Sequence, residues 1–421
     1  MEQISINDLP RLKKKFDGYK LSFNENGIVK FTHQDDEITF ELSDYINVTN
    51  KLYMPNYNNC ILNIDASISK YFNEVVNYPT YKPLDDILSS KKYKHIAIML
   101  LDGMGSYIIR KNLSEDSFIN KHKVCDLNAV YPPTTACAIP ALCSGFEPLK
   151  TGWVGWSNYF SEVDKFVVMF RNQEYYSGEA LDINIERDIL PYKKFYEGFD
   201  TYKFELGPSF HPSNCQTFEE MCDRYVLEIK DKESSFCYMY WSEPDTIMHI
   251  NGAYSSEAKE MLKKMDEALN KLNKEISDDT LIIITADHGH IDVNPIYLAN
   301  FKDILSMLKR MPSNEGRCAF FSVKDNKKKS FEKLFISYFG DYFSLLKKEE
   351  FIEEGYLGDK KIINHKIDSF IGDYVAIAKK NYYFNFSPIV SNVDEDEMVF
   401  KSHHAGITAN EMVIPFIVMK K

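Results

Sequence analysis

The sequence predicts an α/β protein, a three-layer α/β/α sandwich built on a mainly parallel central sheet. Residues 95–101, 236–241 and 281–286 are apolar runs with the length of buried strands. Residues 255–276 carry apolar side chains at spacings of three and four, which is typical of an amphipathic helix. Strands that alternate with helices favour a parallel sheet covered on both faces.

The N-terminal segment has a different pattern. Residues 19–23, 27–32 and 37–42 are short alternating runs separated by polar turns, which predicts a small β-meander. We therefore assign residues 1–55 to a small β-rich extension, either a structural addition or an appendage that binds a partner.

A second departure from the strand and helix pattern lies late in the chain. Between residues 296 and 395 the density of motifs falls and the lysine content rises. Residues 317–323 resemble a strand and residues 330–343 a helix, so this segment is predicted to be an α+β insertion. We interpret it as a cap over the site, with a surface insertion as the alternative. The predicted core is then formed by residues 56–295 together with 396–421.

Composition limits the classes of partner. The chain has 421 residues, of which 44% are hydrophobic, so it can bury a large core. Its 50 Lys and Arg residues are outnumbered by 62 Asp and Glu residues, which gives a net charge of -12. This charge opposes binding to a nucleic-acid backbone, so no nucleic-acid polymer is expected as a partner. An anionic substrate would need local positive charge, which bound metal ions supply.

The sequence also indicates a compartment. The first 20 residues mix charges and contain no apolar stretch of the kind that a signal sequence requires. No run approaches the roughly 18 apolar residues of a membrane span, so no membrane association is expected. Eight cysteines are scattered without C-x-x-C spacing and are interpreted as reduced core residues. These features predict a cytoplasmic protein; no feature indicates its oligomeric state.

Candidate metal ligands follow two of the predicted strands. Asp287 and His288 come directly after the run that ends at residue 286, and Asp102 comes directly after residue 101, with Gly103 and Gly105 beside it. Ligands of open α/β sheets bind at the carboxyl ends of the strands, and Asp with His suits zinc or manganese. Turn residues or a helix-capping Asp are the alternative interpretation.

Further histidines extend the candidate set. Asp245 and His249 are four residues apart, so on a helical turn both lie on one face and can chelate one ion. His403 and His404 precede the final apolar run, and because adjacent side chains point in different directions at most one of them is expected to be a direct ligand. For two other histidines the sequence favours a surface or packing role: His211 and His290.

A hydroxyl nucleophile is predicted in residues 131–145. Two prolines turn the chain, after which small residues begin a helix near Thr134 and Thr135. A Thr at such a start is normally an N-cap, but free backbone N–H groups there also suit an incoming anion. Metal coordination would lower the pKa of the hydroxyl and make it a nucleophile.

Together these segments supply three aspartates, three histidines and one hydroxyl. Six ligands divide naturally between two divalent ions, with open positions left for a substrate oxygen and the nucleophile. Three carboxylates and a Thr alkoxide balance the charge of the two ions, so a phosphoryl oxygen can bind without prohibitive repulsion. Two ions roughly 4 Å apart would stabilise the attacking and leaving oxygens of an in-line displacement. Zinc is the expected metal, with manganese or iron also compatible.

The order of these motifs resembles the alkaline phosphatase superfamily, most closely its type I phosphodiesterase/nucleotide pyrophosphatase branch. The resemblance covers roughly residues 94–295 and 398–420 and implies an alkaline-phosphatase-like catalytic core with a covalent phosphothreonine intermediate. The family pattern places a proline three residues before the nucleophile and a glycine ten after it, which selects Thr135, with Thr134 as runner-up. By resemblance, one metal is held by Asp245, His249 and His404 and the other by Asp102, Asp287 and His288, with Thr135 near both.

The chain departs from the family in two places. Residues 136–138 are Ala-Cys-Ala where the nucleotide pyrophosphatases usually have Phe-Pro-Asn. Their phosphate-contacting asparagine falls near Trp156, with Asn158 two residues on, so these two are the candidate substrate-binding residues. The resemblance therefore supports the hydrolytic core and leaves nucleotide specificity open.

The sequence favours a phosphodiesterase that acts on a small-molecule phosphate ester over the other functions of similar chemistry. A phosphomonoesterase or phosphomutase of the same superfamily generally places Arg beside the nucleophile, and none lies between residues 111 and 170. A sulfatase needs C/S-x-P-x-R, but the proline after Cys137 is one place late and the arginine is missing. A non-catalytic metal-binding module would lack a ligand or the nucleophile, and the full set is present. The group esterified to phosphate is not indicated.

Overall fold

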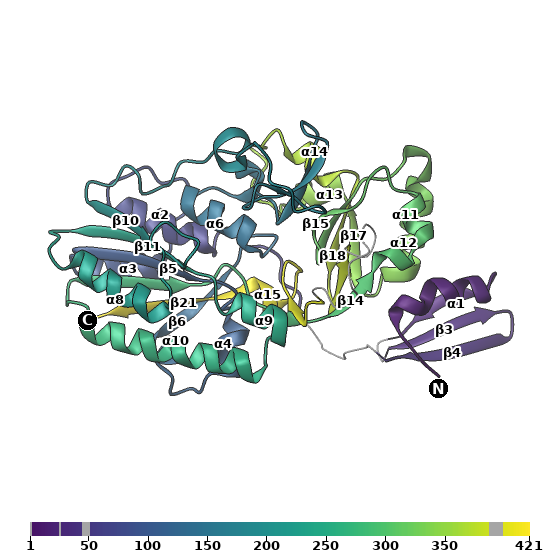
Figure 1. Ribbon diagram of the computed structural model, residues 1–421, viewed down its shortest axis with the longest axis horizontal. Coiled ribbons are helices and arrows are strands. Elements are labelled where there is room, and N and C mark those ends of the chain that lie inside the picture. The colour runs from purple at the N-terminus through teal and green to yellow at the C-terminus, as the bar shows by residue number, and fades with distance from the viewer. Residues whose placement is uncertain (1, 25–26, 44–50, 387–398) are drawn as a thin grey trace.

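The computed structural model describes residues 2–24, 27–43, 51–386 and 399–421. Figure 1 shows a main α/β body, a second sheet beside it and a small N-terminal unit. None of the helices in the described part of the chain combines the length and apolar character that a membrane span requires.

The main body is built on a six-stranded sheet in the described residues, in the order β10-β11-β5-β12-β21-β6. Strands β10, β11, β5 and β12 are parallel, and β21 runs antiparallel to both of its neighbours. The strands are β5 (His95–Leu101), β6 (Lys123–Asn128), β10 (Tyr202–Leu206), β11 (Ser235–Trp241), β12 (Thr280–Thr285) and β21 (Val413–Lys420). Every residue of β5 and β12 is buried, as expected for central strands covered on both faces. The mainly parallel sheet predicted from the sequence is confirmed.

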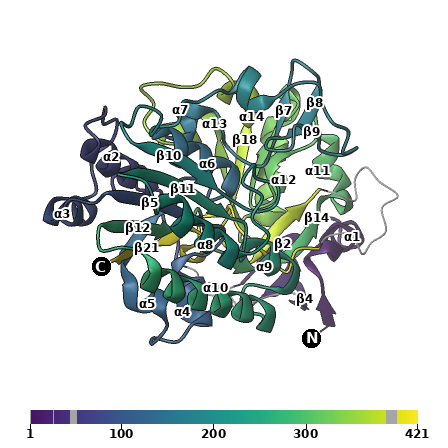
Figure 2. The same ribbon diagram turned by 60° about the vertical axis from the view of Figure 1, so that its left-hand side comes forward.

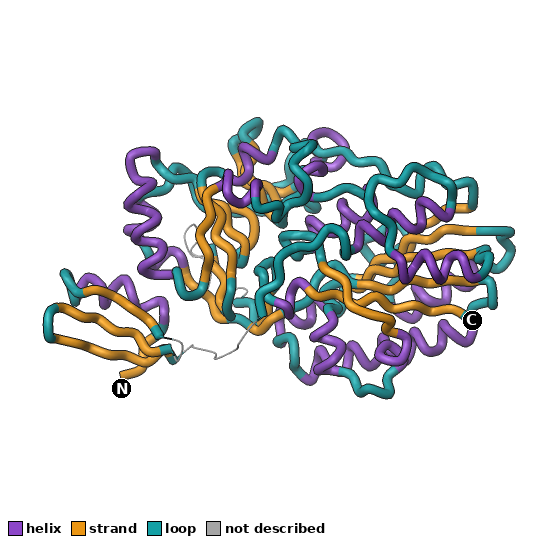
Figure 3. The backbone as a smooth tube through the Cα atoms, turned by 180° about the vertical axis from the view of Figure 1, so that it is seen from behind, coloured by secondary structure: helices purple, strands orange, loops and turns teal. Residues whose placement is uncertain are grey.

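Helices cover both faces of this sheet, as Figures 1 and 3 show. One group contains α2 (Ile61–Tyr71), α3 (Lys82–Ser90) and α6 (Thr135–Ser144). The other contains α4 (Ser106–Asn112), α5 (Phe118–His122), α8 (Phe218–Ile229) and α10 (Ser256–Glu275). Helix α10 begins where the Ser255 hydroxyl accepts a hydrogen bond from the Ala258 N–H, and its apolar stripe packs into the core. Short helices lie near the loops: α7 (Pro148–Thr151), α9 (Asp245–Asn251) and α15 (Ala409–Met412).

A second, antiparallel sheet stands beside the main body and is seen at another angle in Figure 2. Its order in the described residues is β17-β18-β16-β15-β7-β8-β9. The strands are β7 (Ser157–Phe160), β8 (Lys165–Val168), β9 (Gln173–Glu174), β15 (Ser313–Glu315), β16 (Cys318–Phe321), β17 (Phe343–Lys347) and β18 (Tyr374–Ala378). The sheet thus joins the predicted insertion to strands from residues 157–174, which the sequence analysis assigned to the core; the domain boundaries remain predictions.

The insertion contains the strand and the helix expected from the sequence. Helix α12 (Lys328–Phe339) stops at Gly340, earlier than expected, because residue 343 already begins β17. The other elements here are β14 (Asn294–Tyr297), which begins two residues before the predicted boundary, α11 (Lys302–Ser306), α13 (Lys348–Glu353), α14 (Ile367–Ile371) and β19 (Tyr382–Asn385). Two short strands lie in the adjoining segments of the predicted core: β13 (Ile291–Asp292) and β20 (Ser402–His403). Residues 387–395 of the predicted insertion, and 396–398 of the predicted core, lie outside the described residues.

The N-terminal unit confirms the predicted meander and adds a helix to it. Its strands are β1 (Glu2–Ile4), β2 (Lys20–Phe23), β3 (Ile28–His33) and β4 (Asp36–Leu42), with α1 (Leu9–Lys15) packed on them. The Asn7 side chain donates to the Pro295 carbonyl at 3.0 Å and accepts from the Tyr297 N–H at 2.8 Å. The apolar residues of the N-terminal unit belong to the same buried cluster as those of α12. The unit therefore packs against the insertion.

The eight cysteines are free, and all but Cys125 are buried. Their thiols pack among apolar side chains, as the sequence analysis predicted for core residues. The cytoplasmic location inferred alongside them remains a prediction.

A buried ion pair ties the insertion to the segment before β21. The Arg317 guanidinium donates to both carboxylate oxygens of Glu411, at 2.6 and 2.8 Å, and both side chains are fully buried. Glu411 also accepts from the Gly406 N–H at 2.6 Å and the Thr408 hydroxyl at 2.7 Å. These contacts fix the loop that follows His404.

The substitution Glu411→Gln will lower the free energy of unfolding by about 3–5 kcal/mol, because it leaves the Arg317 guanidinium buried without a counter-charge. Urea unfolding followed by circular dichroism measures the change. Asp188→Asn, which breaks the exposed ion pair with Arg187, is the control and should change stability by less than about 1 kcal/mol. Equal effects of the two substitutions would contradict the structural role of the buried pair.

Candidate metal centre

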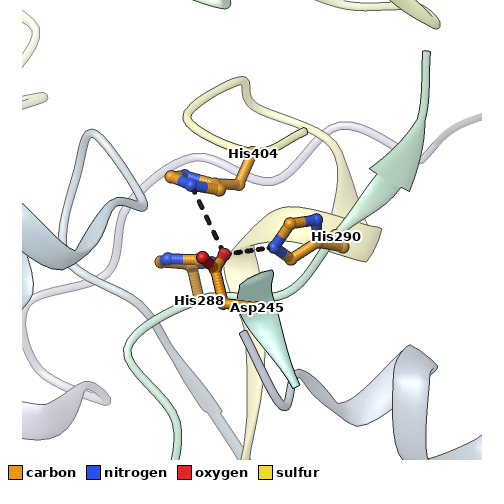
Figure 4. Close-up of side chains that lie close together, drawn as sticks. All are labelled: Asp245, His288, His290 and His404. Carbon is orange, nitrogen blue, oxygen red and sulfur yellow. Dashed lines mark hydrogen bonds and ion pairs between the residues drawn. The ribbon is translucent and has the colours of Figure 1, made fainter. Parts of the chain in front are cut away.

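Acidic and histidine side chains converge at the carboxyl ends of β11, β5 and β12, three neighbouring strands of the main sheet. Figure 4 shows part of this cluster, with Asp245 pointing toward His290 and His404 and with His288 beside it. Strand β21 runs in the opposite direction, so the residues before it reach the same edge. Three groups in the described residues have donor atoms close enough for one ion: Asp102, Asp287 and His288; Asp245, His288, His290 and His404; and His249, His403 and His404.

The two carboxylate oxygens of Asp287 differ in their hydrogen bonds. Its Oδ1 accepts the backbone N–H groups of Gly103 at 3.0 Å and His288 at 2.9 Å. Its Oδ2 is buried and, within the described residues, has no hydrogen-bond partner. Burial, followed by the Asp102 charge, raises the pKa of Asp287. A buried carboxylate oxygen of this kind needs a proton or a cation, and a metal ion fits the position.

Asp102 links this carboxylate to the candidate nucleophile. The Thr135 hydroxyl lies 3.3 Å from Oδ1 and 3.2 Å from Oδ2 of Asp102, and the Tyr240 hydroxyl donates to Oδ2. The Nε2 atom of His288 lies 3.3 Å from Asp102 Oδ1 and 3.5 Å from Asp287 Oδ2. Burial raises the pKa of Asp102, and the nearby Asp245 charge raises it further. These residues fit one divalent cation.

Asp245 is surrounded by imidazoles. Its Oδ1 lies 2.6 Å from His290 Nε2, 3.3 Å from His249 Nε2 and 3.7 Å from His404 Nε2. Burial alone would raise the pKa of Asp245, but His249 and His290 hold it well below its usual range. Burial lowers the pKa of His290 to about 4 and lowers that of His404. One carboxylate facing several ring nitrogens is a second donor set suited to a divalent ion.

In three histidines of the cluster, the hydrogen bond made by Nδ1 shows which ring nitrogen carries the proton. Nδ1 contacts a backbone carbonyl in three rings: His249 with Ser402 at 2.8 Å, His288 with Gly289 at 3.2 Å and His404 with Pro133 at 3.1 Å. A carbonyl only accepts, so each Nδ1 carries a proton and each Nε2 is the nitrogen available to a cation. Such backbone contacts are the usual way in which proteins orient metal-binding histidines.

The adjacent residues His403 and His404 carry their ring protons on different nitrogens. His403 Nδ1 accepts the backbone N–H of His404 at 2.8 Å, so the proton of the neutral ring is on Nε2. Neither nitrogen of His403 is then free to bind a cation, whereas His404 Nε2 is free. Of the two histidines that the sequence left open, the geometry favours His404 as the ligand.

The two threonines face different groups. Thr134 is the N-cap of α6, and its hydroxyl donates to Glu315 Oε1 at 2.8 Å. Thr135 is the first residue of α6, and its hydroxyl lies 3.3 Å from His288 Nε2 as well as beside Asp102. Thr135 is partly exposed although its neighbours are buried. The first hydrogen bonds of α6 run from the N–H groups of Cys137 and Ala138 to the Thr134 carbonyl, so an anion bound at Thr135 can accept the preceding N–H groups, those of Thr135 and Ala136.

Glu315 is a site residue that the sequence analysis missed. It ends β15, is buried, and accepts the Thr134 hydroxyl and the Trp156 N–H, each at 2.8 Å. Burial raises the pKa of Glu315 to about 7. Through Glu315 the second sheet contacts the start of α6 and the chain at Trp156. The 181 positions between Glu315 and Thr134 leave no local signal of this contact.

Glycines allow the loops of the site to approach one another. A Cβ on Gly105 would lie 2.5 Å from the Cα of Gly289, and one on Gly289 would lie 2.0 Å from the Asn410 carbonyl oxygen. The loop after β5 and the loop after β12 are therefore in direct backbone contact. This contact brings Asp102 next to Asp287 and His288.

The structure brings the seven candidate metal-site side chains together: Asp102, Thr135, Asp245, His249, Asp287, His288 and His404. It also adds His290, which is fully buried in the cluster and not at the surface. His211 is outside these groups, with its nearest carboxylate contact 3.8 Å away at Glu205. The ligand roles themselves remain predictions.

The candidate substrate-binding residues lie on and before β7. Asn158 is fully buried, and its side-chain N–H donates to the Gly155 carbonyl at 3.4 Å. Trp156 is partly buried, and the Arg171 guanidinium lies 5.6 Å from its ring centroid. Their contact with substrate stays a prediction.

The sequence of this chain is similar to one known family and to two curated proteins. The sequence model described as type I phosphodiesterase / nucleotide pyrophosphatase matches residues 96–404. Ectonucleotide pyrophosphatase/phosphodiesterase family member 7 from Mus musculus is 36% identical over 69 residues, which cover 15% of this chain and 16% of that protein. The Rattus norvegicus protein of the same name is 32% identical over 77 residues, or 17% and 18% of the two chains. The match thus spans less than a fifth of these relatives.

Solved structures share the fold. An inactive variant of murine ectonucleotide pyrophosphatase/phosphodiesterase 5 in complex with AMP has a TM-score of 0.57 and 16% identity, covering 78% of this chain and 88% of that chain. Phosphonoacetate hydrolase from Sinorhizobium meliloti 1021 in complex with phosphonoacetate has a TM-score of 0.56 and 14% identity, covering 78% and 90%. At these identities the likeness establishes a common α/β fold.

In chelator-treated protein, Glu315 will make stability depend on pH. Its pKa is raised to about 7 in the folded protein, from an ordinary value of 4.5, so the folded state holds the proton more tightly. The free energy of unfolding, relative to Glu315→Gln, will therefore fall by about 3 kcal/mol as the pH rises from about 4.5 to 7, and level off above. Urea unfolding of both proteins across this range measures the difference, with the exposed Glu219→Gln as baseline. A difference that does not change with pH would contradict the assignment.

Proposed function

The chain belongs to the type I phosphodiesterase/nucleotide pyrophosphatase family of the alkaline phosphatase superfamily, and we propose that it is a two-metal phosphoric ester hydrolase that favours phosphodiesters. The observation that carries this proposal is the position of the Thr135 hydroxyl. It lies within 3.3 Å of both Asp102 and His288, at the start of a helix in which the N–H groups of Thr135 and Ala136 precede the first helical hydrogen bonds.

Two sets of ligands fit the proposed metals. Asp102, Asp287 and His288 would hold one ion beside Thr135. A second would be held by Asp245, His249 and His404. When bound, the two ions supply charge that stabilises the attacking and leaving oxygens and lowers the pKa of the Thr135 hydroxyl. Zinc is the proposed metal, because imidazole and carboxylate donors suit it, with manganese or iron as alternatives.

Thr135 is the proposed nucleophile. Its hydroxyl proton passes to the Asp102 carboxylate, and the bond from its Oγ1 to phosphorus forms as the bond to the leaving oxygen breaks. The leaving alcohol takes up a proton from solvent. Water then attacks the phosphothreonine, which returns the Thr135 hydroxyl and releases the phosphate product. The first N–H groups of α6 are placed to bind a phosphoryl oxygen throughout.

The charge around the site favours a diester monoanion. Within the described residues, no ion pair joins a Lys or Arg side chain to the candidate ligands. Arg317, which is near in space to the loop after His404, is already paired with Glu411. A phosphomonoester dianion would bring more negative charge to the site, and in the described residues no Arg guanidinium is paired with the candidate ligands to neutralise it. The likeness to structures described with AMP and with phosphonoacetate supports phosphoryl chemistry of this general class.

With zinc or manganese, the purified protein will hydrolyse bis-p-nitrophenyl phosphate faster than p-nitrophenyl phosphate. Release of p-nitrophenol measures both rates. Faster hydrolysis of the monoester would overturn the diesterase assignment and favour a phosphomonoesterase or phosphomutase.

Thr135→Ala will reduce kcat by at least about a thousand-fold while metal content and fold are retained, because the nucleophile is lost. Thr134→Ala is the matched control. It removes a neighbouring hydroxyl that contacts Glu315, so its effect should be much smaller. Equal activity of the Thr135→Ala protein and the parent would exclude Thr135 as nucleophile.

A further inference from the structure

His290 lies inside the cluster although its sequence context gave it no role. It immediately precedes β13, two residues after His288, and its side chain is fully buried. Its Nε2 lies 2.6 Å from Asp245 Oδ1, the shortest of the three contacts between that oxygen and a histidine described above. Figure 4 shows the ring pointing at this carboxylate from the side opposite to His288.

The partner of the other ring nitrogen fixes where the proton is. His290 Nδ1 lies 2.9 Å from the Ser402 hydroxyl oxygen. That hydroxyl has one proton, and it donates the proton to the Met248 carbonyl at 2.7 Å. Ser402 must therefore accept from His290, so Nδ1 carries the ring proton and Nε2 presents a lone pair.

This tautomer places two acceptors against each other. The lone pair of His290 Nε2 faces a carboxylate oxygen at 2.6 Å, a distance that is repulsive unless something positive lies between them or bridges both. The cation that the proposed function places at Asp245 meets this requirement. Imidazole Nε2 is the commonest nitrogen ligand for such ions, and its partner N–H is oriented by a hydroxyl here.

We infer that His290 is a direct ligand, through Nε2, of the metal ion held by Asp245, His249 and His404. The inference rests on the proposed two-metal function. It increases the chemical difference between the two metal positions, because one then has three imidazoles and one carboxylate while the other has two carboxylates, one imidazole and Thr135. The nitrogen-rich position should favour zinc, and the oxygen-rich position should accept manganese more readily.

The alternative is that His290 only orients Asp245 by donating a hydrogen bond to it. The substitution His290→Gln separates the two roles, because a Gln amide can still donate to Asp245 but offers no imidazole nitrogen. His403→Gln is the matched control. His403 is also a buried histidine beside the cluster, but its Nδ1 accepts a backbone N–H and its Nε2 carries the proton.

Full-length parent and variants are stripped with a chelator and titrated with cobalt(II) and zinc(II). Bound ions are counted by elemental analysis, affinities are measured by calorimetry, and the ligand-field spectrum of bound cobalt reports the donor atoms. We expect two ions in the parent. His290→Gln should weaken one of them at least about a hundred-fold and change its cobalt spectrum, while His403→Gln leaves both ions and the spectrum unchanged.

The outcomes separate this inference from the proposed function. If the parent binds two ions and His290→Gln keeps the parent spectrum and affinity, His290 is not a ligand, while the two-metal hydrolase stands. An equal loss in His403→Gln would also overturn the assignment, because it would reflect general disturbance of the cluster. If the parent binds no ion, the proposed function fails together with the inference.

Discussion

Three carboxylates, Asp102, Asp245 and Asp287, share one buried edge of the main sheet, and the rest of the site is organised around their charge. The parallel strands β5, β11 and β12 are neighbours, so the residues after them are forced to the same edge. Like charges that are close together and removed from water are costly unless cations neutralise them. The orphaned Oδ2 of Asp287 and the imidazole nitrogens facing Asp245 are consistent with sites for two divalent ions.

The surrounding structure holds this edge in place from three sides. Backbone contact between Gly105 and Gly289 joins the loops that carry Asp102 and His288. The Arg317–Glu411 pair fixes the loop after His404 to the insertion. Glu315, from the second sheet, accepts the Thr134 hydroxyl at the start of α6, next to Thr135, whose hydroxyl contacts Asp102. The second sheet therefore contacts the start of α6 directly, through Glu315.

The sequence was sufficient for the sheet and for much of the site, because both depend on local patterns. Apolar runs ending in Asp102 and Asp287 marked strand ends, and the four-residue spacing of Asp245 and His249 marked one helix face. Contacts between residues far apart in the sequence could not be predicted from these local patterns. Glu315 meets Thr134 across 181 positions, and His290 is recognised only when Ser402 and Met248 fix its tautomer. The helix predicted over residues 330–343 was too long because Phe343 is an apolar residue of the next strand, not of α12.

Two metal ions at this edge of the sheet would explain the whole arrangement. A crystal of the zinc-loaded protein, measured on both sides of the zinc absorption edge, locates such ions. We expect two anomalous peaks roughly 4 Å apart, one touching Asp102, Asp287, His288 and Thr135 and the other touching Asp245, His249 and His404. A single peak, or none at these residues in protein saturated with zinc, would contradict this expectation.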